Sequence, residues 1–341
     1  MTGKVMRTCW VFDHPAHVRL LAPFLQAGQS DDVIIATQRK EVEHLLKDGD
    51  GHLPRRQTHW VERPVGDNRR KKALGRWRSS HRFLRQCNQQ GNPIERIVSI
   101  GAPLELMAWR SPFLRRRLAS IVERWYISDT EVNHLAHRLA RKAVTDVVLP
   151  THWRSDLDGG FLEQLNGTRV HRLDGLHGHV HLRPSLRPAV VSDPPRVLVR
   201  RLVGGGIHDD EELVEIPDEV FDGLSTTLAD EDAYGGDAWA LDRELAAHDC
   251  VITQSVTLAS EAALLGTPTL LISKAERGFL DRLESAGYPL FRWKSTCEGD
   301  EWKDLQAQFL TGIHLTEILE PEPWPNARND LTNLFGMELI D

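Results

Sequence analysis

The feature that most constrains the fold is a repeated alternation of short apolar runs with longer amphipathic stretches. Residues 8–12, 32–37 and 146–150 have the length and the β-branched content of buried strands. The stretches between such runs carry helical periodicity, for example residues 18–27 behind Pro15. Parallel strands joined by crossover helices produce this order, so the sequence predicts an α/β fold with doubly wound sheets.

The alternation stops at a proline-rich segment and then starts again, and 341 residues are too many for one ordinary core. We therefore expect an N-terminal lobe over residues 1–182, a linker over 183–195 and a C-terminal lobe over 196–341, whose last helix packs back on the first lobe. Residues 1–190 hold 31 Lys and Arg against 19 Asp and Glu (+12), whereas residues 191–341 hold 11 against 30 (-19). The basic lobe can attract phosphates or anionic lipid, or the two lobes can complement each other.

Composition narrows the class of protein. The chain is 40% hydrophobic and 27% charged, as globular proteins are. Its sequence holds no apolar run of membrane-spanning length and opens without a signal peptide, so we expect a cytoplasmic protein. The four cysteines form no CxxC pair, and Cys9 and Cys250 lie in strand-like runs. Cys9 and Cys250 are therefore expected to be buried free thiols.

The turn after the first strand holds Asp13, His14 and His17. Ligands of α/β folds bind beyond the carboxyl ends of strands, and histidine titrates near neutral pH, so these residues are candidates for acid and base. The alternative is an ordinary helix cap, with Asp13 near the N-terminus of the helix, His14 on the surface and His17 packed structurally.

Asp129 and Glu131 follow another strand end, in YISDTEV. Two acids so close together can act as a proton-transfer pair. They can equally be a helix cap followed by a first-turn acid.

In the second lobe, a polar turn and a helix follow the strand of residues 249–253. A helix N-terminus favours a phosphate, and an acid just inside it can accept hydrogen bonds from sugar hydroxyls. The candidates there are Ser255, Thr257, Ser260 and Glu261, with plain helix capping as the alternative. Arg200 ends a strand and can bind a phosphate or pair with an acid, and a glycine-rich loop after it closes at His208 and Asp209.

The strongest charge feature is residues 69–85, where apolar side chains alternate with cations as in interfacial amphipathic helices. A solvated helix with one packed edge is the alternative. No nucleic-acid motif accompanies the charge, so no nucleic-acid partner is expected. His177, His179 and His181 would share one face of a strand, but no further ligand stands at zinc-site spacing, so no metal site is predicted.

Residues 257–268 (TLASEAALLGTP) resemble the donor-site helix of GT-B glycosyltransferases and non-hydrolysing UDP-GlcNAc 2-epimerases. The chain as a whole more closely resembles the archaeal and bacterial family called domain of unknown function 354. The resemblance rests on D-x-P-x-H-V at residues 13–18, SDTE at 128–131, LVR at 198–200 with the later His208-Asp209, and residues 261–268. Two segments depart from the family: QSV at 254–256 replaces a glycine-rich loop, and LDGLHG at 173–178 replaces Tyr-x-Gly-Tyr-x-Glu.

The resemblance implies a GT-B-like fold, with two Rossmann-like lobes whose parallel sheets face a central cleft. It implies that the C-terminal lobe binds a nucleotide-sugar through Arg200, His208, Asp209, Ser255, Thr257, Ser260 and Glu261. The N-terminal lobe would bind the sugar or an acceptor near Asp13, His14, His17, Asp129 and Glu131.

The expected function is that of a nucleotide-sugar-dependent glycosyltransferase in glycan or glycolipid assembly. A sugar-nucleotide 2-epimerase is the near alternative, and a non-catalytic nucleotide-sugar-binding or scaffold protein is the alternative from another class. We expect a nucleotide-sugar substrate, no cofactor and no metal, and a lipid or glycan acceptor. Residues 69–85 are expected to contact the inner face of a membrane. The oligomeric state is left open.

Overall fold

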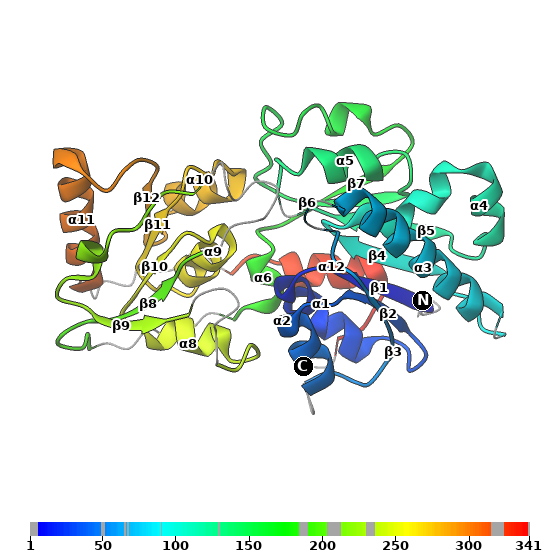
Figure 1. The fold of residues 1–341 in the computed structure, drawn as a ribbon, viewed down its shortest axis with the longest axis horizontal. Coiled ribbons are helices and arrows are strands. Elements are labelled where there is room, and N and C mark those ends of the chain that lie inside the picture. Colours follow the sequence, from blue (N-terminus) through cyan, green and yellow to red (C-terminus); the bar gives the residue numbers. More distant parts are fainter. Residues whose placement is uncertain are drawn as a thin grey trace. The chain divides into compact units, whose positions relative to one another are not determined.

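The computed structural model describes residues 6–48, 52–64, 66, 68–89, 91–128, 130–183, 190–202, 213–229, 236–314 and 324–339. The chain divides into two compact units (Figure 1). Unit 1 comprises Met1–His181 together with Asn326–Asp341, and unit 2 comprises Leu182–Pro325. Each unit contains a parallel sheet covered by helices, as expected from the alternation in the sequence.

Unit 1 contains a seven-stranded parallel sheet in the order β3-β2-β1-β4-β5-β6-β7. Its strands are β1 (Thr8–Phe12), β2 (Val33–Thr37), β3 (Gln57–Val61), β4 (Arg96–Ile100), β5 (Glu123–Ile127), β6 (Asp146–Pro150) and β7 (Arg169–Leu173). Its helices are α1 (Pro15–Ala27), α2 (Lys40–Glu43), the π-helical η1 (His44–Asp48), α3 (Arg69–Gln89), the 3-10 helices η2 (Pro103–Arg110) and η3 (Leu162–Gln164), α4 (Pro112–Arg117), α5 (His134–Ala140), α6 (Gly178–His181) and α12 (Ala327–Phe335).

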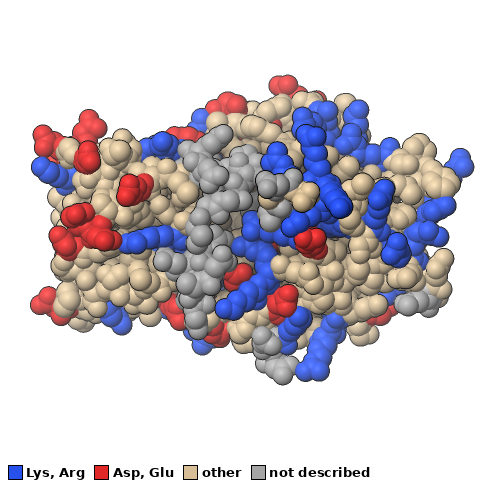
Figure 2. All heavy atoms as spheres, in the orientation of Figure 1, with Lys and Arg blue, Asp and Glu red and all other residues tan. Residues whose placement is uncertain are grey.

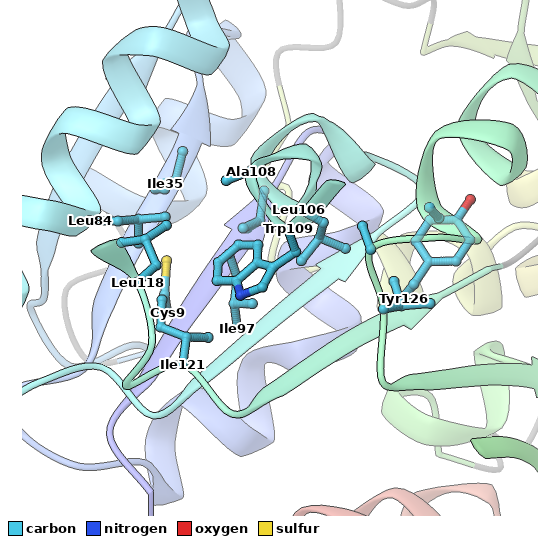
Figure 3. Packing of buried hydrophobic residues seen from close by; sticks show 14 of the residues in the cluster. Cys9, Ile35, Leu84, Ile97, Leu106, Ala108, Trp109, Leu118, Ile121 and Tyr126 are labelled. Carbon is cyan, nitrogen blue, oxygen red and sulfur yellow. The ribbon is translucent and has the colours of Figure 1, made fainter. Parts of the chain in front are cut away.

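One face of this sheet is covered by α3, η2 and α5. Every residue of β1, β2, β4 and β6 is buried, which explains why these strands are mostly apolar in sequence. Figure 3 shows the packing: Leu84 of α3 and the η2 residues Leu106 and Trp109 lie against Cys9 and Ile97 of the sheet.

The opposite face is covered by α1, α6 and α12. Phe335, in the last turn of α12, makes edge contacts with Trp10, Phe24 and Trp125, at ring-centroid distances of 5.9, 5.2 and 5.3 Å. The end of the described chain is therefore part of the core of unit 1.

Unit 2 contains a five-stranded parallel sheet in the order β12-β11-β10-β8-β9. Its strands are β8 (Arg196–Arg200), β9 (Ser225–Leu228), β10 (Cys250–Thr253), β11 (Thr269–Ile272) and β12 (Leu290–Trp293). Its helices are the 3-10 helix η4 (Asp218–Phe221), α8 (Leu241–Ala247), α9 (Val256–Leu264), α10 (Gly278–Ser285) and α11 (Gly299–His314). A separate core forms around buried side chains of β8, β10, β11 and α11.

Cys9 and Cys250 are buried free thiols, which confirms the prediction made for these two cysteines.

The histidine tract at 177–181 is not a strand, because residues 178–181 form the single turn α6. Successive helical residues turn by about 100°, so alternate histidines there do not share one face. His179 instead uses Nδ1 to accept a hydrogen bond from the backbone N–H of Leu176, at 2.9 Å.

Candidate functional site

The sheet order of unit 1 reverses between β1 and β4, so the crevice beyond the carboxyl ends of these two strands is the expected ligand position. Asp13 follows β1 directly. Gly101 follows β4 with a positive φ of 58°, which suits glycine, and its carbonyl accepts a hydrogen bond from Asn133 Nδ2 at 3.4 Å. The turn that the sequence singled out therefore lies at this switch point.

A buried ion network lies directly behind Asp13. Arg76 of α3 is 3% exposed, and its Nη1 donates to Asp13 Oδ1 at 2.7 Å. The same guanidinium donates to both carboxylate oxygens of Glu105 in η2, at 2.8 and 3.2 Å. Thr37, at the end of β2, donates to Asp13 Oδ1 and accepts from Arg76. Side chains at or just beyond the carboxyl ends of β1, β2 and β4 are thus joined through one arginine.

This network fixes the charge of Asp13. Burial alone would raise the pKa of its carboxyl, but the charge of Arg76, the hydrogen bonds from Thr37 and Arg76, and His17 hold that pKa well below its ordinary value. Burial opposes the charged form of Arg76, yet Glu105 and Asp13 raise its pKa well above the ordinary value. A carboxylate stabilised in this way is a weak proton acceptor near neutral pH, so the geometry favours hydroxyl binding by Asp13 over general-base catalysis.

His14 is the N-cap of α1, and its Nδ1 accepts a hydrogen bond from the backbone N–H of Ala16 at 3.3 Å. The rings of His14 and His17 lie 5.7 Å apart, centroid to centroid, on the first turn of the helix. His14 therefore caps the helix itself and is half-buried, whereas the capping alternative placed it on the surface.

Of the second predicted acidic pair, Asp129 lies outside the described residues. Glu131 is buried, and its Oε1 accepts a hydrogen bond from the backbone N–H of Arg154 at 3.0 Å, which ties the turn after β5 to the turn after β6. Because β5 is the second neighbour of β1, the turns holding Glu131 and Asp13 start about 10 Å apart. That spacing suits two groups on either side of a ligand better than a direct proton-transfer pair.

In unit 2, Arg200 and Thr253 are register partners at the carboxyl ends of the adjacent strands β8 and β10. Ser255 follows as the N-cap of α9 and accepts a hydrogen bond from the N–H of Leu258 at 3.4 Å. Thr257 is exposed in the first turn, whereas Ser260 and Glu261 are buried further along the helix. Arg200, Ser255 and Thr257 therefore lie together at one sheet edge, while His208 and Asp209 fall outside the described residues.

Gln254, part of the departure from the glycine-rich family pattern, has a structural role. Its Oε1 accepts from the N–H of Leu202 at 2.8 Å, and its Nε2 donates to the carbonyl of Val214 at 2.7 Å. The side chain of Gln254 therefore links the turn before α9 to Leu202 and Val214, which lie on either side of the glycine-rich loop. Both of its polar atoms are used in holding that turn in place.

Sequence reasoning missed Arg76, Glu105 and Thr37. A signal for Arg76 was present: the buried residues of α3 are Arg76, Ser80, Phe83, Leu84 and Cys87, which follow helical spacing and place this arginine on the core-facing stripe. No such signal connects Arg76 to Asp13, because 63 residues separate them.

None of the described helices is long and apolar enough to cross a membrane. No protein-family model matches this chain, and no curated protein sequence matches it either.

Solved structures do match, over nearly the whole chain. UDP-GlcNAc 2-epimerase from Methanocaldococcus jannaschii is 11% identical with a TM-score of 0.58, covering 96% of this chain and 98% of that one. The Neisseria meningitidis UDP-GlcNAc 2-epimerase bound to UDP-GlcNAc is 12% identical with a TM-score of 0.56, covering 96% and 99%. The glycosyltransferase MurG from Acinetobacter baumannii is 12% identical with a TM-score of 0.52, also covering 96% and 99%. This chain therefore has the GT-B type of α/β fold, with two Rossmann-like lobes, as the sequence predicted.

Proposed function

We propose that the protein is a nucleotide-sugar-dependent glycosyltransferase acting in glycan or glycolipid assembly, with the nucleotide bound by unit 2. The observation that carries the proposal is the edge formed by β8, β10 and α9. Arg200 offers a bidentate cation there, and beside it the first turn of α9 offers backbone N–H groups and the positive end of a helix dipole. These groups suit a diphosphate, and no metal is needed to neutralise it.

The comparisons support a nucleotide-sugar as the ligand class. Solved structures of the same fold include an epimerase bound to UDP-GlcNAc and a glucosyltransferase in complex with UDP. Unit 1 would then hold the sugar or an acceptor beside Asp13. We also infer that the chain is a divergent member of the family called domain of unknown function 354. We further propose a cytoplasmic enzyme with a lipid or glycan acceptor that meets the inner face of a membrane through residues 69–85.

A sugar-nucleotide 2-epimerase is the second candidate. The observation in its favour is the buried carboxylate of Glu131, two strands from Asp13 at the same sheet edge, since inversion at a sugar carbon needs acids and bases around the ring. A non-catalytic nucleotide-sugar-binding or scaffold protein is the third, and it predicts binding without turnover.

The test is a thermal-shift panel of UDP-, GDP-, dTDP- and CMP-sugars against the wild type, Arg200→Gln and Arg201→Gln. Arg201 is a matched control because its guanidinium donates to exposed Asp218 at 3.1 Å and stacks over Phe221. A nucleotide that raises the Tm of wild type and Arg201→Gln but not of Arg200→Gln supports the site, by ligand linkage. If no nucleotide shifts the Tm, or if both variants lose the shift equally, the proposed site is wrong.

Products then separate the candidates. NMR of the stabilising nucleotide-sugar is expected to show release of the nucleoside diphosphate when an acceptor is present. A C2 epimer without release would identify the epimerase, and unchanged ligand would identify the binding protein.

A further inference from the structure

Unit 1 carries a strongly cationic surface over α3 and α4, and Figure 2 shows Lys and Arg side chains crossing this part of the molecule. The sequence of α3 (RRKKALGRWRSSHRFLRQCNQ) contains eight Lys and Arg and no acid. The structure divides them: Arg76 faces the interior and is neutralised by Asp13 and Glu105, and Lys72 pairs with Glu62 at 2.8 Å. The remaining Lys and Arg side chains of α3 are exposed, apart from Arg85, which is half-buried.

Six arginines form what we call the arginine seam: Arg78, Arg82 and Arg85 of α3 with Arg115, Arg116 and Arg117 of α4. Among the described residues, none of the six has a carboxylate partner within ion-pair distance. Uncompensated like charges on one surface repel one another and are neutralised most effectively by an external anion.

The helices α3 and α4 both pack against η2, which places them on the same side of unit 1. Burial lowers the pKa of His81, and the charges of Arg85, one turn away on α3, and Arg117, on α4, lower it further. Both arginines therefore act on the same imidazole.

Trp77 and His81 lie on the same helix with their rings 6.1 Å apart and with Nε1 and Nε2 turned away from solvent. The part of the surface open to a ligand is therefore the arginines, and a phosphate diester would supply the negative charge that they lack.

Exposed apolar side chains indicate which kind of phosphate. Leu74 of α3 is 44% exposed, and Phe113, at the start of α4, is 61% exposed with the guanidinium of Arg117 over its ring at 4.2 Å. Leu74 offers no ring on which a nucleotide base could stack, whereas apolar tips set among arginines match the boundary between lipid headgroups and acyl chains. We propose that the arginine seam, with Leu74 and Phe113, docks unit 1 on an anionic phospholipid surface.

This inference extends the expected contact of residues 69–85 to α4 and names the arginines and apolar side chains that make it. It lies wholly within unit 1 and does not depend on nucleotide binding by unit 2. Loss of vesicle binding and loss of the nucleotide-induced Tm shift are therefore separate results.

The experiment is flotation of the full chain with vesicles of phosphatidylcholine that contain about 30% phosphatidylglycerol, at low and at high salt. We expect binding that weakens at high salt and is absent with pure phosphatidylcholine. The triple variant Arg115→Gln, Arg116→Gln, Arg117→Gln is expected to lower the vesicle partition coefficient about 100-fold, and Phe113→Ser about tenfold.

The matched control replaces three exposed cations of unit 2, with Arg243→Gln, Lys294→Gln and Lys303→Gln, and is expected to bind like the wild type. Equal losses in both triple variants, or retained binding in the α4 variant, would overturn the proposal. Salt-sensitive binding of an RNA oligomer that is insensitive to Phe113→Ser, without vesicle binding, would assign the seam to nucleic acid instead.

A second readout tests the centre of the surface. Short-chain phosphatidylglycerol should raise the pKa of His81, because an anion offsets Arg85 and Arg117; the shift is read from imidazole NMR, assigned with His81→Gln. An unchanged His81 titration in the presence of bound lipid would place the contact elsewhere.

Discussion

At the scale of single residues, the least expected group is Arg76, a guanidinium buried between two carboxylates. We predict that Glu105→Gln lowers the free energy of unfolding by about 3 kcal/mol, because it removes the fully buried bidentate partner of Arg76 and turns an amide N–H towards the guanidinium. Urea denaturation measures the change. The matched control is Glu62→Gln, which removes the exposed pair with Lys72 and is expected to cost less than about 1 kcal/mol. Equal effects of the two substitutions would contradict the buried network.

Asp32 makes stability depend on pH. It accepts hydrogen bonds from the N–H of Thr8 at 2.7 Å and from Trp10 Nε1 at 3.0 Å, but burial raises its pKa from 3.8 to about 6. The folded chain therefore binds the proton more tightly than the unfolded chain does. The contribution of Asp32 to stability is greatest below about pH 4 and is lost as the pH rises towards 6.

We predict that the stability of Asp32→Asn relative to wild type rises by about 3 kcal/mol between pH 4 and pH 7, since a pKa difference of about 2 is worth that much. Urea denaturation of both proteins across this range measures it. A difference that stays constant with pH would show that Asp32 titrates normally.

At the scale of elements, the strands were the most predictable part. Fully buried strands are mostly apolar, so β1, β2 and β6 could be found from the sequence alone. The turn at 177–181 could not, because four residues give too short a pattern to separate a helical turn from a strand. The position of Asp13 at a sheet edge was also predictable. Its charge state was not, because Arg76 reaches it from a helix far along the chain.

The turn between β10 and α9 depends on one side chain. We predict that Gln254→Glu lowers the free energy of unfolding by about 2 kcal/mol, because a carboxylate cannot donate to the carbonyl of Val214 and would face it unpaired. Gln26→Glu is the matched control: Gln26 Nε2 makes the same kind of bond to the carbonyl of His52, at 2.7 Å, on the surface. Losing the Gln26 hydrogen bond is expected to lower the free energy of unfolding by less than about 0.5 kcal/mol. A similar cost at both sites would argue against a structural role for Gln254.

At the scale of the whole molecule, the chain passes from unit 1 to unit 2 and returns through α12. A hydrogen bond as well as packing holds α12 against unit 1, since Arg96 Nη1 donates to the carbonyl of Phe335 at 2.8 Å. The cores of the two units are built from different strands and helices, so a cavity made in one core acts first on its own sheet.

Phe335→Ala and Phe309→Ala form a matched pair for this division, because both residues are almost fully buried phenylalanines on helices that cover a parallel sheet. Each is expected to cost about 3–5 kcal/mol. In hydrogen exchange followed by mass spectrometry, Phe335→Ala should speed exchange in β1, α1 and β5, although these lie more than 200 residues earlier in the chain. Phe309→Ala should instead speed exchange in β12 and α11, where its ring meets Phe291 at 5.6 Å.

Faster exchange confined to α12 in the Phe335→Ala variant would mean that this helix is peripheral. Faster exchange in the same peptides of both variants would mean that the two cores unfold as one, because only then would a cavity in either sheet open both.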